Sequence, residues 1–285
     1  MLFMWVTIAI SRDLVYLHST SDRGGQGLGQ AMSGVLLAYG LARETNRSLC
    51  IDIRMENHNI AEYLVDRGQW ARECPSAGKT YYYWNFGYAD SLKQIEAAAH
   101  SSLPVIALRG NERRAKDTQL GRLLFTRVFR FPEPVQFDVQ AVVHLRLGDS
   151  SAGWGSDVRR ILRMSHMSTE EAVDNAIKCA RRTIPQKTTR TGGYRIMFLS
   201  DTEAAKNYAS RLANVITRKH PVKEPWSTGP FSDVIDTWKD AQYMITAPVF
   251  VHTQGAFGEF CARANPHTVV QLESWLENNG FHNSL

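Results

Sequence analysis

Runs of apolar, strand-forming residues alternate with helical patterns along most of the chain, and this alternation most restricts the possible fold. A strand, a helix and a second strand in that order pack as neighbouring parallel strands, with the helix covering one face of the sheet. The pattern predicts strands at 14–18, 49–53, 105–108, 141–147, 194–199, 248–252 and 269–272. It predicts helices at 31–43, 92–99, 119–129, 168–182, 203–215 and 233–244, and one that ends at 264. We therefore predict an α/β fold with mostly parallel sheets and helices on both faces.

Two prolines interrupt this alternation near the middle of the chain. Pro132 and Pro134 stop regular structure shortly before the strand that begins at Ala141. A chain of 285 residues, of which 44% are hydrophobic, is long enough for two globular domains. We predict domains at 1–131 and 132–285, and we leave open whether the last helix packs back on the first domain.

The strand that begins at Ala141 ends in polar and ionisable residues. His144, Arg146 and Asp149 follow its buried start, and Gly148 breaks the strand. Ligands of open α/β sheets bind at the carboxyl ends of the strands. Arginine offers a planar fork of donors that suits a phosphate, and glycine lets a backbone N–H approach the same anion. We predict an anion site here; the alternative is a surface ion pair between Arg146 and Asp149.

A glycine-rich loop, 19–29, separates the first predicted strand from the first predicted helix. The free N–H groups of a helix N-terminus favour an anion, so this loop is a second candidate phosphate site. Gly25, Gly27 and Gly29 also match part of a dinucleotide-binding fingerprint, with Asp52 as the ribose acid, but Gln30 stands where the third glycine belongs. A nicotinamide-dependent oxidoreductase and a plain turn without ligand both remain alternatives.

Two later strands also end in small polar residues. Ser200 and Asp201 follow the strand at 194–199, and the segment 253–258, Thr-Gln-Gly-Ala-Phe-Gly, follows the strand at 248–252. Asp201 either caps the next helix or holds the ribose or base of a ligand. The second segment is a further candidate phosphate cradle at a helix start, with a plain turn as its alternative.

Charge and cysteine content limit the class of protein. The net charge of +5 suits a phosphate-bearing small molecule, and the chain lacks the basic block of a nucleic-acid-binding tail, so we expect no nucleic-acid partner. Cys50, Cys74, Cys179 and Cys261 are far apart and form no metal-binding pattern. We predict inert buried thiols at Cys50, Cys179 and Cys261 rather than a zinc site or a disulfide, and we favour a cytoplasmic location.

The apolar segment 1–10 is too short to span a bilayer and lacks the basic start of a secretory signal. We expect a soluble protein, with a trimmed membrane anchor left open.

Read together, four of these segments resemble motifs of one enzyme superfamily. The run His144-Leu-Arg-Leu-Gly-Asp149 resembles the HxRxGD motif of the fucosyltransferase superfamily, which includes the α1,2-, the α1,6- and the protein O-fucosyltransferases. Gly27-Leu-Gly-Gln30 is similar to their early glycine loop, Ser200-Asp201 to their second motif and Thr253–Phe257 to their third. The resemblance implies a GT-B fold, with two Rossmann-like domains whose mostly parallel sheets face each other across a cleft.

The resemblance also implies roles for these residues in holding a nucleotide-sugar donor. Arg146 would grip the β-phosphate, and His144 and Asp201 would contact the nucleoside. Gly27 and Gly29 would close the cleft from the first domain. The other implied donor-binding residues are Gly148, Ser200, Thr253, Gln254, Gly255, Ala256 and Phe257. The resemblance favours GDP-fucose as the donor. Leu147 replaces a second arginine that many relatives carry, Gln30 an asparagine, and Gly255-Ala256 two serines, and these departures leave a UDP-sugar such as UDP-xylose as the alternative.

The implied reaction is an inverting transfer of the sugar to a hydroxyl of a glycan or protein. A metal ion or preorganised donors must stabilise the departing diphosphate, and the sequence has no Asp-x-Asp metal grip. We therefore expect metal-independent catalysis by Arg146 with no cofactor besides the donor. Asp149, Asp157 and Asp22 are the candidate general bases, and Asp149 has orientation of Arg146 as its alternative role. A non-catalytic nucleotide- or carbohydrate-binding protein remains a further alternative.

Overall fold

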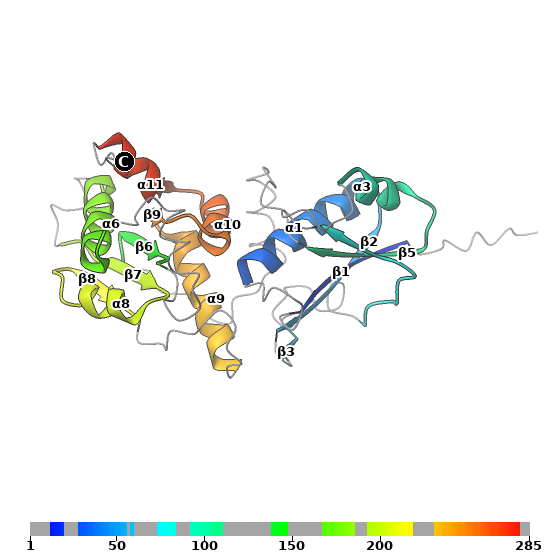
Figure 1. Ribbon diagram of the computed structural model, residues 1–285, viewed down its shortest axis with the longest axis horizontal. Coiled ribbons are helices and arrows are strands. Elements are labelled where there is room, and N and C mark those ends of the chain that lie inside the picture. The colour runs from blue at the N-terminus through cyan, green and yellow to red at the C-terminus, as the bar shows by residue number, and fades with distance from the viewer. Residues whose placement is uncertain are drawn as a thin grey trace, which may run out of the picture. The chain divides into compact units, whose positions relative to one another are not determined.

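The structure is a computed structural model that divides into two compact units, Met1–Arg130 and Phe131–Leu285 (Figure 1). It describes residues 12–19, 28–55, 58–59, 73–83, 92–110, 138–147, 167–185, 193–218 and 231–279. Each unit contains a five-stranded sheet. The predicted helix at 119–129 and the apolar segment 1–10 lie outside the described residues.

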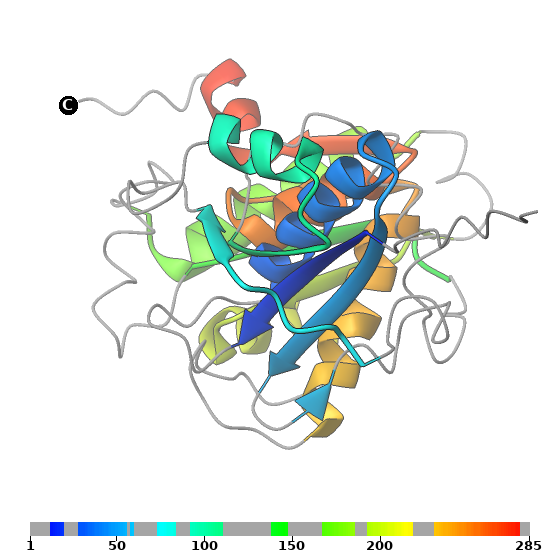
Figure 2. The same ribbon diagram turned by 90° about the vertical axis from the view of Figure 1, so that its right-hand side faces the viewer.

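The first unit is built on a sheet with the strand order β3-β2-β1-β5-β4. The strands are β1 Asp13–Ser19, β2 Ser48–Met55, β3 His58–Asn59, β4 Thr80–Tyr83 and β5 Val105–Gly110. β3 pairs antiparallel with β2, and the other pairs are parallel. The helices α1, Leu28–Glu44, and α3, Leu92–His100, lie together on one face of the sheet (Figure 2).

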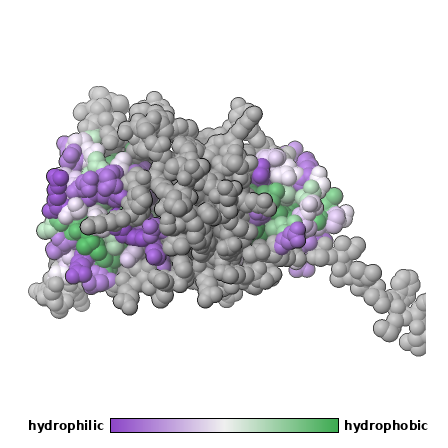
Figure 3. Space-filling model, turned by 90° about the horizontal axis from the view of Figure 1, so that it is seen from below, coloured by the Kyte–Doolittle hydropathy of each residue, from purple (hydrophilic) through white to green (hydrophobic). Residues whose placement is uncertain are grey.

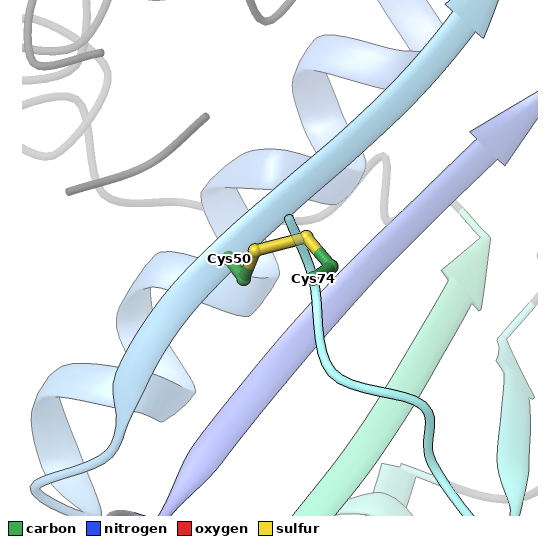
Figure 4. The surroundings of a disulfide bond; sticks show 2 residues. All are labelled: Cys50 and Cys74. Carbon is green, nitrogen blue, oxygen red and sulfur yellow. A yellow bond between two sulfur atoms is a disulfide. The ribbon is translucent and has the colours of Figure 1, made fainter. Parts of the chain in front are cut away.

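The opposite face of this sheet is covered by an extended segment, 73–79. Cys74 of this segment forms a disulfide with Cys50 of β2, with 5.7 Å between the Cα atoms (Figure 4). Cys74 and Ala77 pack on a small apolar cluster of Val15, Cys50 and Ala107. The covering segment and the disulfide thus take the place that a helix has on the other face.

The disulfide contradicts the prediction that Cys50 is a free thiol. Its partner lies 24 residues further along the chain, and cysteine spacing alone does not reveal that the chain returns over the sheet. Cys179 and Cys261 are free and buried as predicted, and burial raises the pKa of the Cys179 thiol to about 11. The predicted cytoplasmic location gains no support from the disulfide, because disulfides persist mainly in oxidising compartments.

The second unit contains five parallel strands in the order β10-β9-β6-β7-β8. The strands are β6 Ala141–Leu145, β7 Ile196–Ser200, β8 Val215–Thr217, β9 Val249–His252 and β10 Thr268–Gln271. In chain order this is the 3-2-1-4-5 arrangement of a Rossmann sheet, with β6 as its first and central strand. The chain moves outward from β6 in one direction through β7 and β8, and then crosses to the other side of β6 to form β9 and β10.

Helices cover both faces of this second sheet, as predicted (Figure 1). They are α6 Thr169–Thr183, α8 Glu203–Ala209, α9 Phe231–Thr246, α10 Ala256–Ala264 and α11 Leu272–Asn278. A large apolar cluster joins α6, α8 and α11 to alternate residues of the strands, among them Val143, Phe198 and Val251. α11 packs on α6 of its own unit through Leu272 and Leu276.

One predicted helix is shorter than its pattern indicates. The apolar spacing predicts a helix at 203–215, but α8 ends at Ala209 and Val215 begins strand β8. Asn214 adopts a left-handed φ of 62°, which asparagine tolerates better than most residues. Three β-branched residues then pair with β7, where their side chains fit a sheet better than a helix.

The described residues include no helix that is long and apolar enough to cross a membrane. On the face shown in Figure 3, hydrophilic and hydrophobic residues intermingle over the described surface of both units.

Candidate functional site

Three polar strand ends meet at the carboxyl edge of the second sheet. β6 lies between β7 and β9, and the chain builds the sheet outward from β6 on the β7 side first and on the β9 side afterwards. This crossing point is where open α/β sheets bind ligands. The structure therefore brings together the segments 144–147, 200–202 and 252–257, which are far apart in the sequence.

Arg146 follows β6 directly and lies between the two neighbouring strand ends. Its backbone N–H donates to Oγ1 of Thr253 at 2.9 Å, and its Nε lies 3.8 Å from Oδ2 of Asp201. The Arg146 side chain is 36% exposed. The backbone is thus held in place while the guanidinium remains accessible to a ligand from solvent.

Asp201 holds the end of β6 as well as the guanidinium of Arg146. Its Oδ1 accepts the backbone N–H of Leu147 at 3.0 Å. The residue at the N-cap of α8 is Thr202 and not Asp201, so the capping role considered for Asp201 is wrong. Ser200 acts similarly, because its hydroxyl donates to the Leu145 carbonyl at 2.7 Å. Both side chains of the second motif therefore bind the backbone at the end of β6 or just beyond it.

Thr253 joins β9 to β6 beyond the end of the sheet ladder. Its N–H donates to the His144 carbonyl at 3.1 Å, and its hydroxyl oxygen accepts the N–H of Arg146. Only 1% of Thr253 is exposed. Thr253 lies behind Arg146 and positions it, rather than presenting its hydroxyl to solvent.

Gly255 allows the chain to pass close to the Arg146 side chain. Its φ of 156° and ψ of 144° lie in a region that only glycine occupies readily. A Cβ at this position would lie 3.3 Å from Cδ of Arg146 and 3.6 Å from its Nη1. α10 begins at the next residue, Ala256, so the positive end of its dipole adjoins the arginine. An arginine fork next to a helix N-terminus is suited to an anion.

His144 is held against α10 as a neutral ring. It makes an edge-to-face contact with Phe257, with 5.9 Å between the centroids. A Cβ on Gly258 would lie 3.1 Å from the buried Nδ1 of His144, which has no hydrogen-bond partner among the described residues. Burial lowers the pKa of His144 to about 3, and the charges of Arg146 and His252 act in the same direction. His144 is therefore uncharged at neutral pH and packs edge-to-face on Phe257.

Two further residues complete this edge of the sheet and were not predicted. They are His252, whose Nδ1 lies 3.1 Å from the Thr253 carbonyl, and Glu273, whose Oε1 accepts the N–H of Gln254 at 2.8 Å. Glu273 could have been found from the sequence, because it follows the last predicted strand and strand ends carry the site. The side chain of Gln254 is exposed.

The other predicted site residues lie elsewhere. Gly29 is in the first turn of α1, in the first unit. Asp22, Gly27, Gly148, Asp149 and Asp157 lie outside the described residues, so their predicted roles stay predictions. Within the described ranges, no group of three or more His, Cys, Asp or Glu side chains is arranged to hold a metal ion.

Comparison with known proteins identifies the fold. No protein-family model matches the chain, and no curated protein matches it in sequence. Among solved structures, NodZ alpha-1,6-fucosyltransferase soaked with GDP-fucose is 12% identical, with a TM-score of 0.54 over 90% of this chain and 93% of that one. Fucosyltransferase NodZ from Bradyrhizobium is 11% identical, with a TM-score of 0.56 over 92% of this chain and 96% of that one.

NodZ co-crystallised with GDP is also similar, with 12% identity and a TM-score of 0.53 over 92% of this chain and 94% of that one. The likeness covers nearly the whole length of both chains and confirms the predicted fold class. The chain has the fold of the NodZ fucosyltransferases, a GT-B fold of two Rossmann-like units.

Proposed function

We propose that this protein is a glycosyltransferase that moves a sugar from a nucleoside diphosphate donor to a hydroxyl of a glycan or protein. The observation that carries the proposal is the position of Arg146, a partly exposed guanidinium between Asp201, Gly255 and the start of α10. The fold supports it, because two of the similar NodZ structures are described as soaked with GDP-fucose and co-crystallised with GDP.

Arg146 would stabilise the leaving group. When the sugar–phosphate bond breaks, negative charge develops on the departing diphosphate, and preorganised donors lower the energy of that transition state. The guanidinium supplies a charged fork, and the first N–H groups of α10 supply the helix dipole. Asp201 and Thr253 hold the arginine before the donor arrives, so little reorganisation is needed.

GDP-fucose is the favoured donor, and the proposed transfer inverts the anomeric centre without a metal ion. The general base is proposed from Asp149, Asp157 and Asp22. His144 is a poor candidate, because a base works best with a pKa near the operating pH and burial lowers the pKa of His144 to about 3.

A binding panel tests the donor class. Wild-type protein and Arg146→Ala would be titrated with GDP, UDP, TDP and NAD, with magnesium and with a chelator, and followed by thermal unfolding. A ligand at 100 times its dissociation constant stabilises the fold by about 2.7 kcal/mol, which a melting curve resolves. We expect stabilisation by GDP that is independent of magnesium and absent in Arg146→Ala.

Other outcomes would change the proposal in defined ways. Stabilisation by UDP would keep the enzyme class and assign a UDP-sugar donor. Stabilisation by NAD alone would contradict the proposal and favour an oxidoreductase. Release of GDP from GDP-fucose in the presence of a glycan acceptor would then confirm turnover, and binding without release under all acceptors would favour a non-catalytic protein.

A further inference from the structure

Glu273 lies beside the third motif through the register of the second sheet. β10 pairs with β9 so that Gln271 is opposite His252. Continuing the two chains by two residues places Glu273, in the first turn of α11, next to Gln254. Its Oε1 accepts the Gln254 N–H at 2.8 Å. A carboxylate from the far edge of the sheet thus reaches the loop that passes Arg146.

This hydrogen bond holds one side of a peptide unit whose other side is also held. The Thr253 carbonyl belongs to the same peptide and points the opposite way, as the N–H and C=O of a trans peptide must. It lies 3.1 Å from Nδ1 of His252. A carbonyl oxygen can only accept, so this contact requires the proton of His252 on Nδ1. Glu273 and His252 together prevent this peptide from rotating.

The held peptide determines how the loop meets Arg146. On one side of it, Thr253 accepts the Arg146 N–H. On the other side, Gly255 passes so close to the arginine that a Cβ would lie 3.3 Å from Cδ. Rotation of the peptide between Thr253 and Gln254 would displace Gly255 and the first turn of α10. The contacts on both sides of the guanidinium therefore depend on this one peptide.

Burying part of a carboxylate costs folding free energy unless hydrogen bonds or opposite charges compensate it. One oxygen of Glu273, Oε2, is buried with no hydrogen-bond partner among the described residues. Burial raises the pKa of the Glu273 carboxyl. Hydrogen bonds from the Gln254 and Glu273 backbone N–H groups and from the Gln271 side chain offset part of this effect. α11 packs through the apolar residues Leu272, Leu276 and Trp275, which need no charged neighbour. The competing explanation is that Glu273 stabilises α11 through the helix dipole.

We propose that Glu273 is a positioning residue for the donor site: its carboxyl holds the Gln254 amide so that the loop 253–255 keeps Arg146 ready for the donor diphosphate. This inference rests on the proposed function of Arg146. It adds a residue from α11, outside the three motifs, to the set that determines donor affinity.

Two substitutions separate this role from the helix-dipole explanation. Glu273→Gln loses the charge but keeps an oxygen within reach of the Gln254 N–H. Glu273→Asp keeps the charge at the start of α11 but withdraws the oxygen by one methylene. Positioning predicts that Glu273→Gln binds GDP within about threefold of wild type, whereas Glu273→Asp binds about tenfold more weakly. The helix-dipole explanation instead predicts that Glu273→Gln loses stability because it loses the charge, whereas Glu273→Asp keeps it.

The controls are the same two changes at Glu277, an exposed residue of the same helix. Titration calorimetry with GDP gives the affinity, and steady-state kinetics with GDP-fucose should show the loss in KM for the donor. Hydrogen exchange of the Gln254 amide is measured in the protein without nucleotide. It should be faster in Glu273→Asp and unchanged in Glu273→Gln and in both Glu277 variants.

The two kinds of measurement distinguish the possible failures. Wild-type protein that binds no nucleoside diphosphate would overturn the proposed function, while the Gln254 exchange rate would still decide whether Glu273 holds the loop. Nucleotide binding that is equal in wild type and Glu273→Asp would overturn the positioning role alone. Equal exchange of Gln254 in both proteins would do the same.

Discussion

Single residues around Arg146 serve mainly to hold the arginine in place. Thr253 and Asp201 accept the backbone N–H groups that directly follow β6, and Asp201 also lies beside the guanidinium. The resemblance assigned Thr253 to the diphosphate and Asp201 to the nucleoside, and these roles stay predictions. Their hydrogen bonds show that both residues are already engaged with the protein before any donor binds, which is how a preorganised site is built.

Gly255 provides a direct test of the space around the guanidinium. Gly255→Ala places a methyl group 3.3 Å from Cδ of Arg146 and forces an alanine into a φ of 156°. Backbone strain of this kind costs about 1 to 3 kcal/mol. We expect Gly255→Ala to fold with reduced stability and to bind GDP at least about tenfold more weakly, as measured by calorimetry.

Gly193→Ala is the matched control for this prediction. Gly193 also has a positive φ, of 89°, but among the described residues no atom outside its chain neighbours lies within 4 Å of an added Cβ. The control should lose stability and keep its GDP affinity. Equal affinity in both variants would mean that the close approach of Gly255 does not matter for binding.

The lowered pKa of His144 should make the free energy of unfolding depend on pH. Its pKa falls from 6.5 to about 3 in the folded protein, mainly through burial, so the unfolded chain binds the proton more readily. The contribution of His144 is therefore complete above pH 6.5 and is lost as the pH falls from 6.5 toward 3. Linkage gives a loss of about 2 kcal/mol at pH 5, with His252 acting in the same direction.

Urea unfolding at pH 7.5 and pH 5 measures this effect. We compare the change in unfolding free energy between the two pH values in wild type and in His144→Asn, because other titrating groups contribute equally to both. The variant should lose less stability on acidification. The same loss in both proteins would show that His144 accepts a proton in the folded state without cost.

At the scale of elements, several features depend on contacts that a local pattern does not contain. β8 has only three residues, and it forms because Val215–Thr217 can pair with β7. Arg47 is only 6% exposed, and its guanidinium donates to the carbonyls of Ala99, Ser101 and Leu103 around the end of α3. The sequence shows a charged residue there, but not the carbonyls that make its burial tolerable.

The Cys50–Cys74 disulfide should stabilise the first unit. It closes a loop with a sequence separation of 24, and Cys50 is fully buried. Chain-entropy estimates give about 3 to 4 kcal/mol for a loop of this length. We expect reduction of the wild type to lower its resistance to urea, and Cys74→Ser to show the lower resistance with or without reductant.

Thiol counting checks that disulfide independently. The chain has four cysteines, of which Cys179 and Cys261 are free in the structure. Denatured protein without reductant should therefore show two reactive thiols, and four after reduction. Four thiols without reductant, in protein prepared under oxidising conditions, would contradict the pairing.

At the scale of the whole molecule, the alternation of strand and helix patterns was sufficient to predict the α/β class. Most elements lie close to their predicted ranges, namely the strands β1, β2, β5, β6, β7, β9 and β10 and the helices α1, α3, α6, α9 and α10. The polar residues at the ends of β6, β7 and β9 were also recognisable. This worked because hydrophobic periodicity is a local property, and because parallel strands place their carboxyl ends at one edge of a sheet.

The sequence by itself thus determined the fold class and the strand ends that carry the candidate site. The tertiary structure alone decided the strand order, the disulfide over the first sheet, the burial of Thr253 and the reach of Glu273 to Gln254. These features join residues that are far apart in the sequence; Arg146 and Thr253, for example, are 107 positions apart. Periodicity records which face of an element is buried, but the partner of each polar group is set by packing between distant segments.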